Sequence, residues 1–166
     1  MKKEKIRIGC GAGFSGDRIE PALVLAEKGE LDYLVLECLA ERTIALAQKR
    51  KLQDASKGYD PLLEKRIKSL LPLLVKNQIK LITNMGAANP LAAAHKVIEI
   101  AKELNLSIKV AAVTGDDATQ WVKNSSNNFT VLENGQELND YEVISINAYM
   151  GVEGILEALT ADAQII

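Results

Sequence analysis

The chain has 166 residues, of which 48% are hydrophobic and 25% are charged, and a domain of this length buries roughly 70% of the surface of its unfolded chain. Its formal net charge of −2 gives no electrostatic reason to expect binding to nucleic acid or to an anionic membrane. No apolar run approaches the ~20 residues that a membrane-spanning helix needs.

The numbers of histidines and cysteines exclude further kinds of site. One histidine excludes any site that needs two, and it weakens Ser-His-Asp and Cys-His schemes. Two cysteines do not make a disulfide framework, so we expect free, buried thiols and a cytoplasmic location.

Strand-like and helix-like patterns alternate along the chain. Apolar runs predict strands at 5–9, 33–38, 79–83, 108–115 and 142–147. Helical spacing predicts helices at 19–28, 41–56, 61–76 and 90–104. Because the strands are apolar throughout, we expect a mostly parallel sheet covered on both faces, as in a Rossmann-like three-layer α/β domain that takes up residues 1–166. The basic runs "QKRK" (48–51) and "EKRIK" (64–68) are predicted to lie on solvated helix faces.

Two later segments depart from this alternation. Asn134-Gly135, within 129–140, predicts a β-hairpin that leaves the edge of the sheet. Residues 154–166 are typical of a helix, a turn and the first residues of another buried strand. Since a complete domain seldom ends by starting a core strand, we expect the chain to be the truncated N-terminal part of a longer protein.

A glycine-rich loop, "GAGFSG" (11–16), follows the first strand. Its glycines match G-x-G-x-x-G, and Glu37 closes the second strand about 20 residues later, as in dinucleotide-binding folds. Asp17 and Glu20, however, place negative charge where a pyrophosphate needs positive potential. A sharp turn that needs glycine for close packing is the preferred explanation, and a nucleotide-binding enzyme using Gly11–Gly16 is the alternative.

The loop after the third strand, "TNMGAANP" (83–90), lies between two asparagines. Asn89-Pro90 is a strong N-cap and N1 pair, so capping alone explains Asn89. Capping does not explain Asn84 or Gly86. The N–H groups at a helix N-terminus suit a carboxylate or phosphate, and we expect this loop to form one wall of a cleft.

Two acidic residues follow the fourth predicted strand in "GDD" (115–117). Asp116 can cap the next helix and Asp117 can favour its dipole. The pair also suits a hard cation or a general base, and this functional explanation and the capping explanation are equally favoured. The sequence leaves the cofactor unknown.

Ligands of open α/β sheets bind beyond the carboxyl ends of the strands. Acid–base roles are therefore predicted for five carboxylates, the last two of which would also hold any metal: Asp17, Glu37, Glu41, Asp116 and Asp117. Substrate binding is predicted for small and amide residues: Gly13, Ser15, Asn84, Gly86, Asn89 and Asn147.

Together these loops resemble the AtuA-like family of acyclic terpene utilisation. The matching pieces are "GAGFSGDR" (11–18), "GELDYLVLECLAERT" (29–43), "NMGAANP" (84–90), "VTGDD" (113–117) and "NAYMGVEGILEAL" (147–159). Family members are longer, and the chain resembles only their N-terminal portion.

The resemblance implies a part in bacterial breakdown of acyclic terpenes such as citronellol and geraniol through CoA thioesters. The expected function is a catabolic enzyme domain acting on an acyl-CoA or a small branched carboxylate, by a reaction that the resemblance does not assign. The expected partner is thus a small-molecule substrate, such as a CoA thioester, and neither nucleic acid nor membrane is expected. A non-catalytic assembly domain or homo-oligomer, pairing through 163–166, is the alternative from another class.

Overall fold

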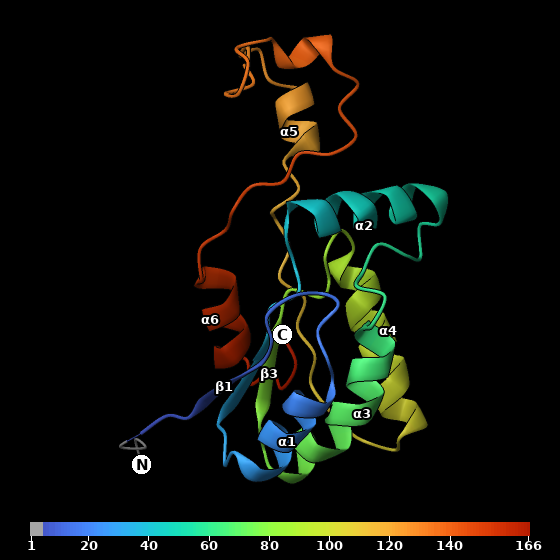
Figure 1. The fold of residues 1–166 in the computed structure, drawn as a ribbon, viewed down its shortest axis with the longest axis vertical. Coiled ribbons are helices and arrows are strands. Elements are labelled where there is room, and N and C mark those ends of the chain that lie inside the picture. The colour runs from blue at the N-terminus through green and yellow to red at the C-terminus, as the bar shows by residue number, and fades with distance from the viewer. Residues whose placement is uncertain (1–4) are drawn as a thin grey trace. The chain divides into compact units, whose positions relative to one another are not determined.

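The computed structural model describes residues 5–166. These residues separate into two compact units. The first unit comprises the described residues up to Val113 together with Glu153–Ile166, and the second comprises Thr114–Val152. The first unit contains the sheet and most of the helices (Figure 1).

A parallel sheet lies at the centre of the first unit. Its strands, in order across the sheet, are β1 (Ile8–Ala12), β2 (Tyr33–Leu36) and β3 (Lys80–Thr83). In the register of all three, Cys10 lies beside Val35 and Val35 beside Ile82. The parallel pairing confirms the predicted α/β class, while β1 pairs only with β2 among the described residues instead of taking the central place that it has in dinucleotide-binding folds.

Two extended segments continue the sheet beyond β3. Ile165 forms parallel bridges to both Leu81 and Val110. The end of the chain therefore lies between β3 and the segment around Val110. Residues 163–166 are largely buried, as predicted. This segment and 108–115, however, contribute only isolated bridges and no full strand.

Five helices belong to the first unit. They are α1 (Glu20–Lys28), α2 (Glu41–Gln53), α3 (Leu63–Lys76), α4 (Pro90–Glu103) and α6 (Glu153–Thr160). The first four lie within three residues of the predicted bounds at either end, because their apolar spacing follows the period of a helix.

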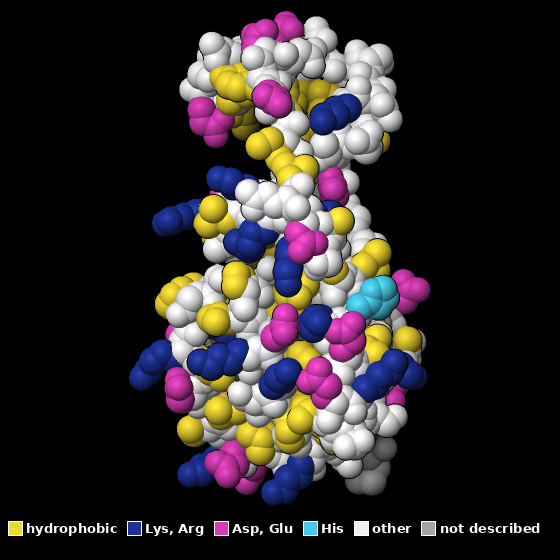
Figure 2. Space-filling view, turned by 90° about the vertical axis from the view of Figure 1, so that its right-hand side faces the viewer, with side chains coloured by type: hydrophobic (Ala, Val, Ile, Leu, Met, Phe, Trp, Pro, Cys, Tyr) yellow, Lys and Arg dark blue, Asp and Glu magenta, His cyan; other side chains and the backbone are white. Residues whose placement is uncertain are grey.

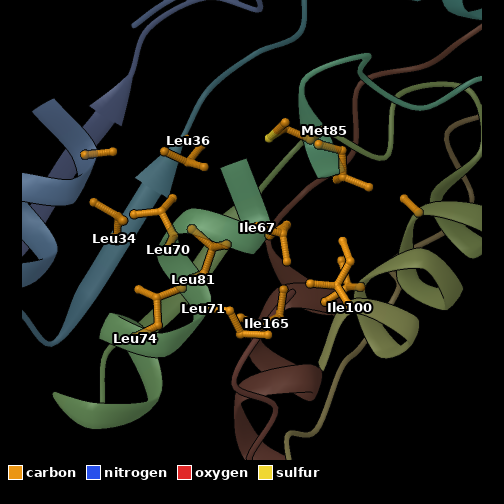
Figure 3. Close-up of a cluster of buried hydrophobic side chains, with 14 of the residues drawn as sticks. Leu34, Leu36, Ile67, Leu70, Leu71, Leu74, Leu81, Met85, Ile100 and Ile165 are labelled. Carbon is orange, nitrogen blue, oxygen red and sulfur yellow. The ribbon is translucent and has the colours of Figure 1, made fainter. Parts of the chain in front are cut away.

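The main core lies between the sheet and the helices α1, α3 and α4. In α3, Ile67, Leu70 and Leu74 recur at helical spacing and point toward Leu34 and Leu81 of the sheet (Figure 3). Each such side chain, fully buried, stabilises the fold by about 1.5–3 kcal/mol relative to an exposed one.

A second cluster lies on the opposite face of the sheet, under α6 (Figure 1). Ala158, Ala163 and Ile166 pack there against Ile82, which alternates with Leu81 along β3 and so points away from the main core. Helices on both faces confirm the predicted three-layer arrangement.

The face that carries α6 is open over β1, because Ile8 is 67% exposed. Cys10 is exposed as well, so the expectation of two buried thiols is wrong for Cys10.

The second unit has little regular structure. It contains α5 (Thr119–Lys123) and the short 3-10 helix η1 (Leu138–Asp140). The predicted hairpin forms as an antiparallel bridge between Thr130 and Glu137. This bridge is isolated within the second unit, where the sequence had suggested an excursion from the sheet edge. The predicted strand 142–147 is wrong, because that segment makes only the antiparallel bridge of Asn147 to Asp117.

The surface of the first unit carries both signs of charge. Figure 2 shows Lys and Arg side chains interspersed with Asp and Glu on one face. Among the described residues, no helix has the length and apolar character needed to cross a membrane.

Candidate functional site

A pocket of about 170 Å³ lies where the loops after β1, β2 and β3 meet the start of α3. It lies entirely within the first unit. Its wall consists of Ser15, Cys38, Leu39, Thr43, Leu46, Arg50, Asp60, Pro61 and Ala87. The pocket is therefore at the carboxyl ends of the strands, where open α/β sheets bind ligands.

Helix α2 supplies one side of the pocket. Its first turn is held by Thr43, whose hydroxyl accepts a hydrogen bond from the Ala40 N–H at 2.7 Å and donates one to the Ala40 carbonyl at 2.9 Å. Thr43, Leu46 and Arg50 follow at helical spacing, so one face of α2 presents a hydroxyl, an apolar group and a guanidinium to the pocket.

Ser15 and Asp60 face the pocket as a hydrogen-bonded pair. The Ser15 hydroxyl donates to Oδ2 of Asp60 at 2.5 Å. The other carboxylate oxygen, Oδ1, accepts the N–H of Leu62 at 2.7 Å, and the Asp60 N–H donates to the carbonyl of Met85 at 2.8 Å. Asp60 is only 4% exposed, so its carboxylate is fixed in place on both sides.

A buried cation, Arg66 of α3, lies behind the pocket. It is 1% exposed. Its Nη1 donates to the Cys38 sulfur at 2.7 Å, and its Nη2 donates to the carbonyls of Ser15 at 3.1 Å and Asp17 at 2.7 Å. Arg66 thus joins the loop after β1 to the end of β2. Its Nε is buried without a hydrogen-bond partner, and no carboxylate of the described residues forms an ion pair with it.

The thiol of Cys38 is protonated at neutral pH. Burial raises the pKa of Cys38 from 9.0 to about 11, against the opposing effect of the Arg66 guanidinium, while the charge of Asp60 raises this pKa further. A neutral buried thiol is a poor nucleophile. Cys38 is therefore part of the pocket wall in its inert form.

Asp17, predicted as an acid–base residue, closes the glycine loop. Its carboxylate accepts the N–H of Gly13 at 3.0 Å and of Arg18 at 2.8 Å. These bonds, that of Gly13 first, lower the pKa of Asp17. A carboxylate on the Gly13 N–H takes the place that a pyrophosphate would need, which disfavours the nucleotide alternative. Gly11 is explained by packing, because a Cβ there would approach the Ala22 Cβ to 2.8 Å.

Glu37 and Asn84 come together at the ends of β2 and β3. The Asn84 side-chain oxygen accepts the N–H of Cys38 at 2.7 Å, and its amide nitrogen donates to Oε1 of Glu37 at 2.8 Å. The same Glu37 oxygen accepts the N–H of Leu39 at 3.0 Å. Asn84 therefore has a structural explanation that the sequence did not reveal, since it sets the main chain on which Cys38 and Leu39 enter the pocket.

Asn89 both caps α4 and holds a neighbouring loop. Its side-chain oxygen accepts the N–H of Ala92 at 3.4 Å, which confirms the predicted cap. Its amide nitrogen donates to the carbonyls of Ala55 at 2.9 Å and Lys57 at 2.7 Å. Gly86 lies so close to Pro90 that a Cβ would come within 2.9 Å of the Pro90 Cα.

Several N–H groups in this loop already have partners. Those of Ala87, Ala88 and Asn89 donate to the carbonyls of Asn84, Gly58 and Gly86. The loop contributes Ala87 to the pocket wall. An anion on these N–H groups would have to displace existing bonds, so the loop serves the pocket as a wall.

The remaining predicted site residues are separate from this pocket. Asp116, Asp117 and Asn147 belong to the second unit, where Asn147 donates to Asp116 at 3.0 Å. Asp117, and not Asp116 as expected, accepts an N–H at the start of α5, from Thr119 at 3.0 Å. Glu41 is the first residue of α2. Across residues 5–166, no three His, Cys, Asp or Glu side chains are grouped as a metal ion would require.

Sequence reasoning missed Asp60 in the pocket wall and Arg66 behind it. Asp60 lies in "KGYDP", which is typical of a turn. Arg66 lies in the run 64–68, which was expected to be solvated, and that expectation is wrong for Arg66. It is also wrong within the run 48–51, where Gln48 is buried and Arg50 lines the pocket. The available signal for Arg66 was its place in α3, because it follows Leu63 by three positions and precedes Leu70 by four, which puts it on the apolar face.

Comparison with known protein families gives a match over nearly the whole chain. The family model described as "Acyclic terpene utilisation family protein AtuA" matches residues 6–166. No curated protein and no solved structure matches the chain.

Proposed function

Since the chain belongs to the AtuA family of acyclic terpene utilisation proteins, we propose that it is a catabolic enzyme domain whose pocket binds a small branched carboxylate or the acyl end of its CoA thioester. The observation that carries the proposal is the composition of the pocket wall. Leu39, Leu46 and Pro61 are apolar, and Arg50 adds one guanidinium.

The size of the pocket favours a short acyl group. At about 170 Å³ it is similar to a cavity of about 150 Å³ that holds a benzene molecule. A branched acyl chain of about six heavy atoms fits such a space. The nucleotide part of CoA does not, so in this proposal it stays outside the pocket.

Charge and shape then select the head group. Arg50 presents a planar, permanently charged fork that matches a carboxylate or a polarised carbonyl oxygen. The apolar wall accepts the methyl branches of a terpene-derived acid, because burying each CH₂ group contributes about 0.8 kcal/mol.

Calorimetric titration with 3-methylbutanoate tests the proposal, with 3-methylbutan-1-ol as the uncharged control of the same shape. We expect the acid to bind and the alcohol to bind at least about ten times more weakly, since a hydrogen bond to a charged group contributes about 1.5–3 kcal/mol. Arg50→Gln should lower the affinity for the acid by a similar factor. Lys49→Gln, which changes an exposed neighbour on α2, should leave this affinity unchanged. Equal affinity for acid and alcohol would overturn the proposal.

A further inference from the structure

We propose that Ser15 is a nucleophile and Asp60 its general base, and that the pair hydrolyses an acyl thioester held in the pocket. The inference rests on the proposed function for the identity of the acyl group. It assigns a reaction class, acyl transfer to water, to a pair of residues that neither the family nor the glycine motif identifies.

The geometry meets the requirements for an activated hydroxyl. A nucleophile needs a base within hydrogen-bond reach, and the base needs a third group that orients it. Ser15 Oγ lies 2.5 Å from Asp60 Oδ2, and the Leu62 N–H holds Oδ1 at 2.7 Å. The Ser15 main chain is fixed in turn by Arg66, which donates to its carbonyl at 3.1 Å.

Both side chains line the pocket, so an acyl group bound there reaches them. Asp60 is 4% exposed, which keeps bulk water from competing for its carboxylate. The turn that leads into α3 explains only one of the two carboxylate oxygens, the one that accepts from Leu62. The other oxygen is committed to the serine hydroxyl.

Of the three nucleophilic side chains in the pocket wall, those of Ser15, Cys38 and Thr43, that of Ser15 is the best placed. The Thr43 hydroxyl donates to the Ala40 carbonyl. Cys38 is 2% exposed, and its sulfur accepts a hydrogen bond from the Arg66 guanidinium. Ser15 is half-buried and its proton already points to a carboxylate.

The reaction balances with water as the co-reactant. Ser15 Oγ bonds to the thioester carbonyl carbon while its proton passes to Asp60. The carbon–sulfur bond breaks, and the leaving thiolate takes that proton. Water then bonds to the acyl carbon and gives a proton to Asp60, the bond from carbon to Ser15 Oγ breaks, and Oγ recovers the proton. The products are a carboxylic acid, which is the ligand proposed for Arg50, and a free thiol.

Labelling with a fluorophosphonate tests the nucleophile directly. The reagent forms an oxygen–phosphorus bond to an activated serine and releases fluoride. We expect intact-mass and peptide mapping to place one adduct on Ser15 of the wild-type chain. Ser15→Ala should abolish the adduct, whereas Ser69→Ala, whose hydroxyl bonds only the Lys65 carbonyl, should leave it unchanged.

Asp60→Asn separates general-base catalysis from the role of Asp60 in the turn before α3. The side-chain oxygen of Asn can close the same turn onto the Leu62 N–H as that of Asp, so the urea midpoint should change little. General-base catalysis contributes about 10²–10⁴-fold, so labelling and the release of CoA from 3-methylbutanoyl-CoA should slow at least about 100-fold. A folded Asp60→Asn variant that labels at the wild-type rate would overturn the assignment.

The wild-type experiment decides the matter even if a variant fails to fold. Absence of a Ser15 adduct, with 3-methylbutanoate still binding, overturns the nucleophile and leaves the proposed function intact. An adduct on Ser15 that saturating 3-methylbutanoate does not prevent overturns the proposed acyl site and leaves the nucleophile intact. An adduct that 3-methylbutanoate prevents supports both.

Discussion

Arg66 is the residue on which the geometry of the site depends most. Its guanidinium forms three hydrogen bonds to groups from two different loops. Arg66→Ala would leave the carbonyls of Ser15 and Asp17 without this donor, and we expect it to lower the free energy of unfolding by about 2–3 kcal/mol. Urea denaturation measures the loss.

Arg66→Lys is the matched control for charge. Lysine keeps the positive charge but has no planar fork to reach three acceptors, so we expect it to recover less than half of the loss. Full recovery by lysine would mean that the charge alone is important and that the hydrogen-bond geometry is not.

Cys38 gives the site a measurable dependence on pH. Its pKa is raised to about 11 in the folded protein from 9.0, so between these values the unfolded chain loses a proton that the folded one keeps. Stability contributed by this group is present below pH 9 and falls as the pH rises toward 11, by up to about 1.4 kcal/mol per pH unit. The difference between wild type and Cys38→Ala in urea melts from pH 8 to 11 isolates this contribution.

Alkylation provides a second readout of the same property. At pH 8, iodoacetamide should modify Cys10, which is exposed, long before Cys38, which is buried. Peptide mapping against time distinguishes the two thiols. Rapid modification of Cys38 in the folded protein would contradict the raised pKa.

At this scale the sequence identified only part of the site. Ser15 was predicted because it lies in a loop beyond a strand, and this follows from local pattern. Asp60 and Arg66 gain their roles from contacts with residues 45 and 51 positions away. Local pattern carries no information about such contacts, and a turn residue and a helical cation have many ordinary roles.

Among the secondary-structure elements, helices were predictable and isolated strands were not. The bounds of α1 to α4 follow from apolar spacing within each segment, together with signals such as Pro90 at the start of α4. A strand, by contrast, forms only where another segment lies beside it and hydrogen-bonds to it. The segment at Val110 is extended because Ile165 lies beside it, and 142–147 has similar apolar residues but no partner in the sheet.

Asn89 links two elements, and its two functions can be separated. Asn89→Ala removes the cap of α4 and both bonds to the loop at Ala55 and Lys57, so we expect a loss of about 1–2 kcal/mol. Asn89→Asp keeps an oxygen for the cap but loses the two amide bonds. Urea melts of the two variants show which bonds account for the lost stability. If Asn89→Asp has the same free energy of unfolding as the wild type, only the cap contributes.

At the scale of the whole molecule, the second unit is an insertion into the first. The chain leaves the first unit at Val113 and returns at Glu153. A Cβ on Gly154 would come within 2.6 Å of the Val113 side chain, so the two ends of the inserted segment are adjacent. Insertions whose ends meet are tolerated well by the domain that carries them.

Replacing residues 114–152 by a short Gly-Ser linker should therefore leave the first unit folded. A shorter loop costs less entropy to close, and we expect a gain of about 1–2 kcal/mol. Circular dichroism and a urea melt of the shortened chain check this. A chain that loses its cooperative transition would show that the first unit depends on residues 114–152.

The place of Ile165 also leads us to expect a particular order of events during folding. Ile165 is part of the main core and bridges Leu81. Forming this contact closes a loop between positions 81 and 165, and the entropy cost of closing the loop precedes any stabilisation by the contact. Its docking is expected to follow the formation of β1, β2 and α3. Ile165→Ala should then cost about 2–5 kcal/mol, nearly all of it as faster unfolding in stopped-flow experiments, with the refolding rate unchanged.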